Sequence, residues 1–310
     1  MQPLVHPGPP TQPRIISAAV RTRRSVCDLQ PNRPLVDQLH EALASLGSDS
    51  GFAEIHGGDY APLSYCIPDV GTEERALSFS DTRARERAHL IYGSVTLGLR
   101  EETPYMHSHC FWQAPDGSYE GGHVWLETAV GEPPPFVTVT AIFDAQWRSA
   151  TDPETRMPVF TPVERRTAMG TQDSGDVDTI ISRVLPNVDI TEALLEVCRR
   201  AGFERASVRA GLGSLAGATF VDRASGKQIS VDGPATEVIA LFGDVRTVDG
   251  EPAARLSCTL VDRHGEMRAG ELMPGENLVA ATFELTVQRI DPSTRTVQSQ
   301  PTPTEYKPNN

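Results

Sequence analysis

The feature that most constrains the fold of this chain is an internal repeat. Four segments of the first half recur in the same order in the second half. They pair 29–43 with 184–198, Gly51-Phe52 with Gly202-Phe203, 89–97 with 238–247 and 107–123 with 255–271. One weak match would carry little weight, but four in one order indicate a duplication. A chain of 310 residues also suits two domains of ordinary size.

Each half is predicted to hold one helix followed by five to seven antiparallel strands. In the second half, Asp189 and Glu192 have the spacing of a capping box, and Gly202 is a typical helix stop. In the first half, Pro34 and Gly47 mark the two ends of the helix. Short apolar or alternating runs follow each helix and predict strands. We therefore expect an α+β fold of two similar domains, each an antiparallel β-sheet of half-barrel or sandwich type packed on one main helix.

Domain boundaries follow from composition. We expect a first, metal-binding domain at 14–147 and a second, ligand-free domain at 179–291, joined by a linker at 148–178. The polar, proline-rich ends, 1–13 and 292–310, are predicted to be disordered tails.

Composition excludes several classes of protein. The net charge of −13 argues against nucleic-acid binding, because phosphate contacts need a surplus of Lys and Arg on one face. No apolar run approaches the ~18 residues that a membrane span needs, and the N-terminal segment does not resemble a secretory signal. The five cysteines are widely spaced and form no Cys-x-x-Cys pair, which favours a reduced, cytoplasmic location.

Three of the eight histidines lie in the stretch YMHSHCFWQAPDGSYEGGHVW, at positions 107, 109 and 123. In a strand, residues i and i+2 share a face, so His107 and His109 converge. The turn signal at 114–117 returns the chain and brings His123 alongside them. Cys110 is out of phase with these histidines, and we expect it in the core.

Three neutral imidazoles at this spacing suit a divalent metal ion. Zn²⁺ fits best and Fe²⁺, Mn²⁺ or Ni²⁺ are possible, with one coordination position open for water or substrate. The alternative is a polar hairpin face without a metal ion.

Other candidate site residues lie around this hairpin. His56, Asp59 and Tyr60 occupy a glycine-rich turn and could supply a base or hydrogen bonds to substrate, unless the Asp only caps its own turn. Glu127 follows His123 and could act as a general base, although an exposed carboxylate is the alternative. A basic group could hold a substrate carboxylate or simply be solvated; its members are Arg21, Arg23 and Arg24.

The second half resembles the PCC (plants-and-prokaryotes-conserved, or PPC) domain. The resemblance rests on LPNVDITEALLEVCRRAGF, GLGSLAGATFVD, GPATEVIALFGDV and ARLSCTLVDRHGEMRAGE, and extends more loosely over 86–143. It implies a compact antiparallel sheet on a helix, often in a trimer, with a three-histidine metal site in prokaryotic members. The first repeat keeps all three histidines, whereas the second has Arg255, Ser257 and Glu271 at the matching places. The AT-hook of the plant members is missing.

From these features we expect a metal-dependent enzyme, a hydrolase or lyase, that acts on a small, carboxylate-bearing molecule. The first repeat would be catalytic and the second structural, in a homo-oligomer that is most simply a trimer. Two alternatives remain open. One is a DNA-associated or regulatory PCC-domain protein, and the other is a ligand-binding module whose metal is structural.

Overall fold

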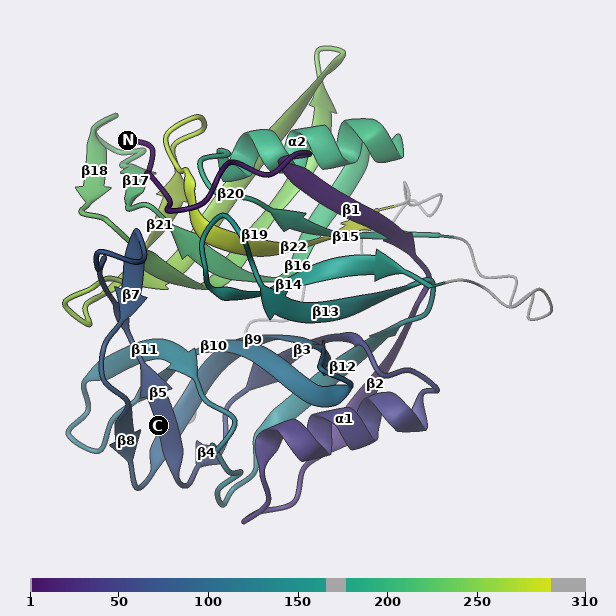
Figure 1. Ribbon diagram of the computed structural model, residues 1–310, viewed down its shortest axis with the longest axis vertical. Helices are drawn as coiled ribbons and strands as arrows, with labels where there is room; N and C mark the ends of the chain where they lie inside the picture. The colour runs from purple at the N-terminus through teal and green to yellow at the C-terminus, as the bar shows by residue number, and fades with distance from the viewer. Residues whose placement is uncertain (1, 166–176, 291–310) are drawn as a thin grey trace, which may run out of the picture.

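The computed structural model describes residues 2–165 and 177–290, and they form two large, mainly antiparallel sheets that face each other (Figure 1). The expected C-terminal tail, 292–310, lies outside the described residues. The fold is dominated by strands, because the only helices of the described chain are α1 (Leu35–Ser45) and α2 (Ile190–Ala201). Neither helix combines the length and hydropathy needed to cross a membrane.

The sheet of the first half has eleven strands. Its main path, from edge to edge, is β2 (Thr22–Asp28), β12 (Phe136–Ile142), β3 (Gly51–His56), β9 (Ala88–Arg100), β10 (Thr103–Gln113), β11 (Tyr119–Val124), β5 (Leu63–Cys66) and β8 (Arg83–Arg85). The additional strands are β4 (Asp59–Tyr60) and β13 (Ala145–Thr151), which pair with β9, and β14 (Pro158–Glu164), which pairs with β13. A separate hairpin consists of β6 (Pro68–Val70) and β7 (Leu77–Phe79).

The sheet of the second half has nine strands. They are, in order, β1 (Ile15–Val20), β15 (Thr179–Val184), β22 (Val279–Arg289), β16 (Arg205–Leu215), β19 (Thr236–Val248), β20 (Glu251–Val261), β21 (Met267–Leu272), β17 (Ala218–Val221) and β18 (Gln228–Val231).

The two sheets have corresponding strand orders. The path β2-β12-β3-β9-β10-β11-β5-β8 matches β15-β22-β16-β19-β20-β21-β17-β18 position by position. The hairpin register agrees as well, since His109 faces His123 in the first half and Ser257 faces Glu271 in the second.

The similarity of 89–97 to 238–247 predicts that Gly93 corresponds to Gly243, but the structure displaces this match. Gly93 faces Cys110, whereas Gly243 faces Leu256, two residues before Cys258. A register irregularity between Val238 and Ala240 accompanies this shift.

The helix ends follow the sequence signals. The side chain of Asp189 accepts hydrogen bonds from the backbone N–H groups of Thr191 (2.9 Å) and Glu192 (3.1 Å), which satisfies two unpaired donors of the first turn. Gly202 ends α2 with a φ of 69°, a left-handed conformation that suits glycine. In α1, Pro34 is the N-cap, and Leu46 ends the helix just before Gly47.

The expected linker is largely folded. Within 148–178, residues up to 151 belong to β13, and 158–164 form β14, where Val159 and Phe160 are buried. This segment is folded because Val159 and Phe160 pack into apolar clusters that contain side chains of both halves. Residues 166–176 of this range lie outside the described residues.

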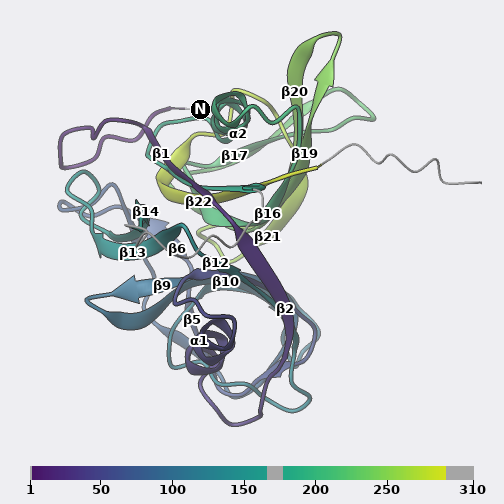
Figure 2. The same ribbon diagram turned by 90° about the vertical axis from the view of Figure 1, so that its right-hand side faces the viewer.

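The N-terminal segment also differs from expectation. β1 falls within the range assigned to the first domain, yet it pairs with β15 in the second sheet, and the chain then crosses into the first sheet as β2 (Figure 2). The segment before it, expected to be disordered, lies against other parts of the chain. Leu4 N–H donates to Asn187 Oδ1 at 2.8 Å, and a ring nitrogen of His6 lies 2.9 Å from the Ala280 carbonyl.

Each half has its own apolar core, and the two cores meet. α1 buries Leu35, Leu39 and Leu43 under the first sheet. Ile239 and Val261 of the second half pack into the same cluster. This shared interface fixes the position of β19 over the hairpin β10–β11, and it thereby builds the site described next.

Candidate metal centre

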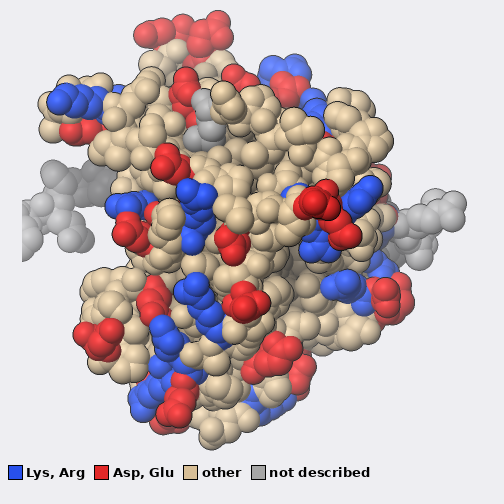
Figure 3. All heavy atoms as spheres, turned by 60° about the vertical axis from the view of Figure 1, so that its left-hand side comes forward, with Lys and Arg blue, Asp and Glu red and all other residues tan. Residues whose placement is uncertain are grey.

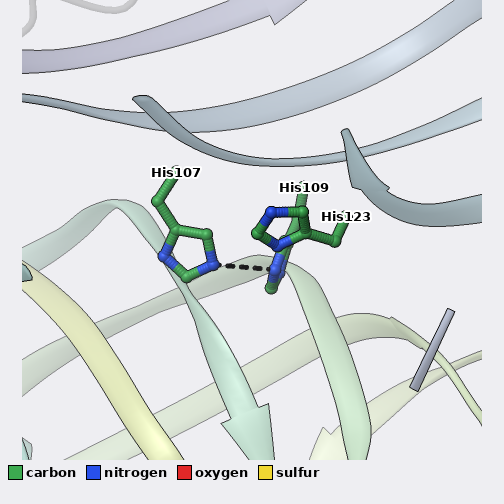
Figure 4. Close-up of side chains that lie close together, drawn as sticks. All are labelled: His107, His109 and His123. Carbon is green, nitrogen blue, oxygen red and sulfur yellow. Dashed lines mark hydrogen bonds between the residues drawn. The ribbon is translucent and has the colours of Figure 1, made fainter. Parts of the chain in front are cut away.

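The three histidines of the β10–β11 hairpin converge as the sequence predicts. Their ligand nitrogens all lie within 4.8 Å of one another, and Nε2 of His107 is 3.0 Å from Nε2 of His109 (Figure 4). The alternating phase of β10 places His107 and His109 on one face, and the pairing of His109 with His123 adds the third ring. A turn with Gly117 at φ 87° makes this return possible.

Backbone and carboxylate groups fix the tautomers of two rings. Nδ1 of His109 lies 2.8 Å from the carbonyl of Val238, which can only accept, so Nδ1 carries the hydrogen. Nδ1 of His107 lies 2.5 Å from Oε2 of Glu284 and donates in the same way. In the neutral rings both Nε2 atoms therefore present lone pairs to each other.

A third acceptor faces this pair. Oε2 of Glu237 lies 2.8 Å from Nε2 of His109. Nε2 of His109 thus meets two acceptors, Nε2 of His107 and Oε2 of Glu237, and without a shared hydrogen these contacts need a positive charge, either a proton or a cation. The three imidazoles fit a divalent metal ion held by His107, His109 and His123, with Glu237 as a neighbouring carboxylate beside His109.

Burial and charge set the protonation of the rings. Burial opposes a charged His109, but the carboxylate of Glu237 and the Val238 carbonyl outweigh it and raise the pKa of this imidazole. Burial lowers the pKa of His123 well below its ordinary value, and its neighbours His107 and His109 lower it further. His123 is thus neutral, and its buried Nδ1 has no hydrogen-bond partner among the described residues.

The glycines beside His123 allow close packing on both sides. A Cβ on Gly122 would lie 2.3 Å from the backbone oxygen of Cys66 on β5. A Cβ on Gly121 would lie 2.6 Å from Ile239 of the second half. The Gly-Gly pair therefore lets β11 fit between its neighbouring strand and the other half of the chain.

A pocket opens from the histidines along the interface between the two halves. It has about 600 Å³ of empty space, part of it open to solvent, and His107, His123 and Glu237 lie in its wall. Most of the remaining wall is apolar or aromatic and comes mainly from β7 and β14 with the segments around them. A buried ion here would be reachable by a small molecule.

The glycine-rich turn does not reach this pocket. His56 is exposed at the end of β3, with its ring 5.1 Å from that of Tyr92. Asp59 is buried and bound by Arg87 and by Nδ1 of His89, the latter at 2.8 Å. Asp59 thus connects β4 to the start of β9 through these two side chains.

Tyr60 lies in the core of the first half. Its hydroxyl is 3.9 Å from Sγ of Cys110, and burial raises its pKa well above the usual value. The buried Cys110 fits its expected place in the core. Glu127 is exposed.

The three arginines lie away from the pocket as well. Arg21 forms an ion pair with Asp144 at 2.8 Å. The Arg23 guanidinium lies over the ring of Phe143, and Arg24 is 3.5 Å from the side chain of Gln288. None of the three lines the pocket.

Sequence reasoning missed the two carboxylates from the second half. Glu237 and Glu284 are 2% and 1% exposed, so each places an acidic side chain in the interior. The sequence does contain an indication of these two residues, because each is the only charged residue in a mostly apolar predicted strand, ATEVIALF or VAATFELTV. What the sequence could not show was that both point at histidines of the other half. Cys66 was also missed; it is buried and pairs with His123 across β5 and β11.

In the second half, the positions that correspond to the three histidines hold other residues with other contacts. Arg255 and Ser257 are exposed, and Glu271 forms an ion pair with Arg223 that lowers its pKa. Within residues 2–165 and 177–290, His107, His109 and His123 form the only cluster suited to a metal.

A family model matches the second half of the chain. Residues 172–291 match the Plants and Prokaryotes Conserved (PCC) domain. The PCC match covers α2 and β15 to β22, and so includes Glu237 and Glu284 but none of the three clustered histidines. No curated protein matches the chain.

Solved structures that match include three small proteins. A plant- and prokaryote-conserved (PPC) protein from Pyrococcus horikoshii is 24% identical, with a TM-score of 0.33, over 42% of this chain and 92% of its own. A metal-containing protein from Archaeoglobus fulgidus is 18% identical, with a TM-score of 0.35, over 46% and 94%. A protein from Bacteroides thetaiotaomicron, named only as a candidate DNA-binding protein, is 16% identical, with a TM-score of 0.34, over 37% and 81%.

Proposed function

We propose that this protein binds one divalent metal ion, most simply Zn²⁺, and through it a small organic molecule in the pocket between its two halves. The observation that carries this is the convergence of the three histidines, two of which, His107 and His123, lie with Glu237 in the wall of that pocket. A metal held by three protein nitrogens keeps a position for an exogenous donor, unlike a closed structural site. When bound, the ion would supply Lewis acidity toward an oxygen of that molecule.

The two halves have separate tasks in this proposal. We infer that they arose by duplication, which the corresponding strand orders and hairpin registers support. The first half holds the ion with His107, His109 and His123. The second half has lost the matching residues and supplies Glu284, which orients His107, and Glu237, which adds negative charge.

Binding of acetohydroxamate tests this function, because the probe is small and binds metals through two oxygens. Titration calorimetry would compare zinc-loaded protein, metal-free protein and a His107→Ala/His109→Ala variant. Binding only to the loaded protein is expected. If zinc binds stoichiometrically but acetohydroxamate does not, the metal is structural and the proposed ligand site is wrong.

Turnover is a second candidate function, and the position of Glu237 favours it. Its Oε2 faces both the histidines and the pocket, where it can accept a proton from water or from a carbon next to a carbonyl. In hydrolysis, water adds to the carbonyl carbon, the bond to the leaving group breaks, and Glu237 passes the proton to that group. In the lyase case, the same oxygen removes the proton from the carbon next to the carbonyl, a C=C bond forms to the neighbouring carbon, and the bond from that neighbour to its hydroxyl breaks; Glu237 then passes the proton to the hydroxyl, which leaves as water.

A panel of esters, lactones and β-hydroxy carbonyl compounds tests turnover. Product formation by the zinc-loaded protein should fall at least about a hundredfold in Glu237→Gln, as for loss of a general base. Equal rates in both proteins would contradict this role.

We do not expect binding to nucleic acid. The chain has a net charge of −13, and acidic and basic side chains are intermixed on the face shown in Figure 3. An electrophoretic shift of duplex DNA at low salt, lost at moderate salt, would contradict this expectation.

A further inference from the structure

The lining of the pocket identifies the class of molecule that it takes. We infer that the ligand is uncharged, with an apolar body about the size of an aromatic ring, an oxygen donor for the metal and a second polar group for two buried hydroxyls. This inference rests on the proposed function, because the metal anchors the ligand.

The apolar side chains in the wall of the pocket indicate that the ligand has an apolar body. Side chains of several separate segments surround the space beside the histidines, and they are Leu77, Phe79, Trp125, Met157, Val159 and Phe160. The ring of Phe79 lies 5.3 Å from that of His123, so the apolar wall begins directly at the metal centre. A ligand that left these surfaces wet would forgo most of the binding energy that the pocket offers.

The side chains that line the pocket indicate that the ligand carries no net charge. No Lys or Arg lines this pocket among the described residues, and Glu237 is its only carboxylate. A carboxylate on the far end of the ligand would therefore be buried without a partner.

The second polar group is indicated by two hydroxyls. Ser149 on β13 and Thr282 on β22 both line the pocket, each with only 7% of its surface exposed. Neither hydroxyl has a hydrogen-bond partner in the described part of the chain, although buried hydroxyls usually have one. Ser214, beside them, already accepts a hydrogen bond from the Ala281 N–H at 3.1 Å. The two free hydroxyls thus fit a hydroxyl, carbonyl or amide of the ligand.

This class differs from the carboxylate-bearing molecule expected from the sequence. That expectation relied on Arg21, Arg23 and Arg24, and the structure does not bring them to the pocket. A phenolic or aromatic carbonyl compound has the required features.

A series of hydroxamates with the same metal-binding head tests the inference in zinc-loaded protein. Calorimetry would compare acetohydroxamate, benzohydroxamate, its 3- and 4-hydroxy derivatives and 4-carboxybenzohydroxamate. Burial of the ring should make benzohydroxamate bind about tenfold more tightly than acetohydroxamate. One of the hydroxy derivatives should gain about threefold more, and the carboxy derivative should lose about tenfold.

Variants assign these effects to the pocket. Phe79→Ala should reduce the advantage of benzohydroxamate over acetohydroxamate, whereas Phe136→Ala, at a side chain that is 77% exposed on β12, should not. Ser149→Ala combined with Thr282→Val should bring the ratio of hydroxylated to plain benzohydroxamate affinity to about one, as expected for one lost hydrogen bond.

Two results would overturn the inference while leaving metal-dependent binding intact. They are equal affinity for acetohydroxamate and benzohydroxamate, and tighter binding of the carboxy derivative. Failure of acetohydroxamate itself would instead contradict the proposed function.

Discussion

The carboxylate of Glu237 lies 2.8 Å from Nε2 of His109, although the two residues come from different halves of the chain. The Nδ1 of the same imidazole contacts the carbonyl of Val238, the next residue along β19. One strand of the second half therefore holds both nitrogens of a histidine in the first. The proposed metal centre therefore depends on the packing of the two halves and not on the hairpin alone.

Replacement of Glu237 by Gln should weaken metal binding. The amide is neutral, and its N–H can donate to Nε2 of His109, which ties up a ligand atom. Loss of such a carboxylate lowers metal affinity by roughly 10- to 100-fold in comparable sites. Competition with a chromophoric chelator measures this, and Glu271→Gln, on the corresponding hairpin of the second half, is the matched control. Unchanged affinity in Glu237→Gln would show that the carboxylate does not contribute.

Metal affinity should fall as the pH is lowered, because a protonated imidazole cannot bind a metal ion. The pKa of His109 is raised by Glu237, so proton competition should begin above the ordinary histidine value of about 6.5. The pKa of His123 is lowered, so this ring should remain available throughout. Chelator competition between pH 8 and pH 5 tests the sign. An affinity that is constant over this range would contradict histidine ligation.

Much of the fold could be predicted from the sequence because its signals are local. Asp189, Gly202 and Pro34 act on the backbone beside them, and the helices begin and end where these residues predict. The convergence of His107 and His109 is equally local, since it follows from the alternation of side chains along a strand.

The remaining features depend on contacts between distant segments. Asp59 and Tyr60 pair with the start of β9, and packing turns Tyr60 into the core toward Cys110 and not toward the pocket. Nothing in the local pattern shows that β1 joins the second sheet, or that Glu284 reaches His107 across 177 residues. Such pairings are set by how two apolar faces fit together.

Gly122→Ala should destabilise the first half and disturb the metal centre. The new methyl group would meet the backbone oxygen of Cys66 at 2.3 Å, so β5 and β11 would have to separate beside His123. Such overpacking typically costs about 1–3 kcal/mol. Chemical denaturation and metal titration would measure the two effects.

The corresponding residue of the second half provides the control. A methyl group on Gly270 would meet the side chain of Phe220 at 3.0 Å, and a side chain can yield more easily than a backbone. Gly270→Ala should therefore cost less stability and leave metal affinity unchanged. If Gly270→Ala weakened the metal site as much as Gly122→Ala, the effect would be global and not local to His123.

The metal content of the purified protein after exposure to Zn²⁺ tests the central claim most directly. Elemental analysis should give one metal ion per chain for the natural sequence and for Ser257→Ala, at the position that corresponds to His109. The His107→Ala/His109→Ala variant should contain none, with circular dichroism showing that its strands are retained. Full metal occupancy in that double variant, or a natural protein that binds no metal, would contradict the assignment of His107, His109 and His123 as a metal centre.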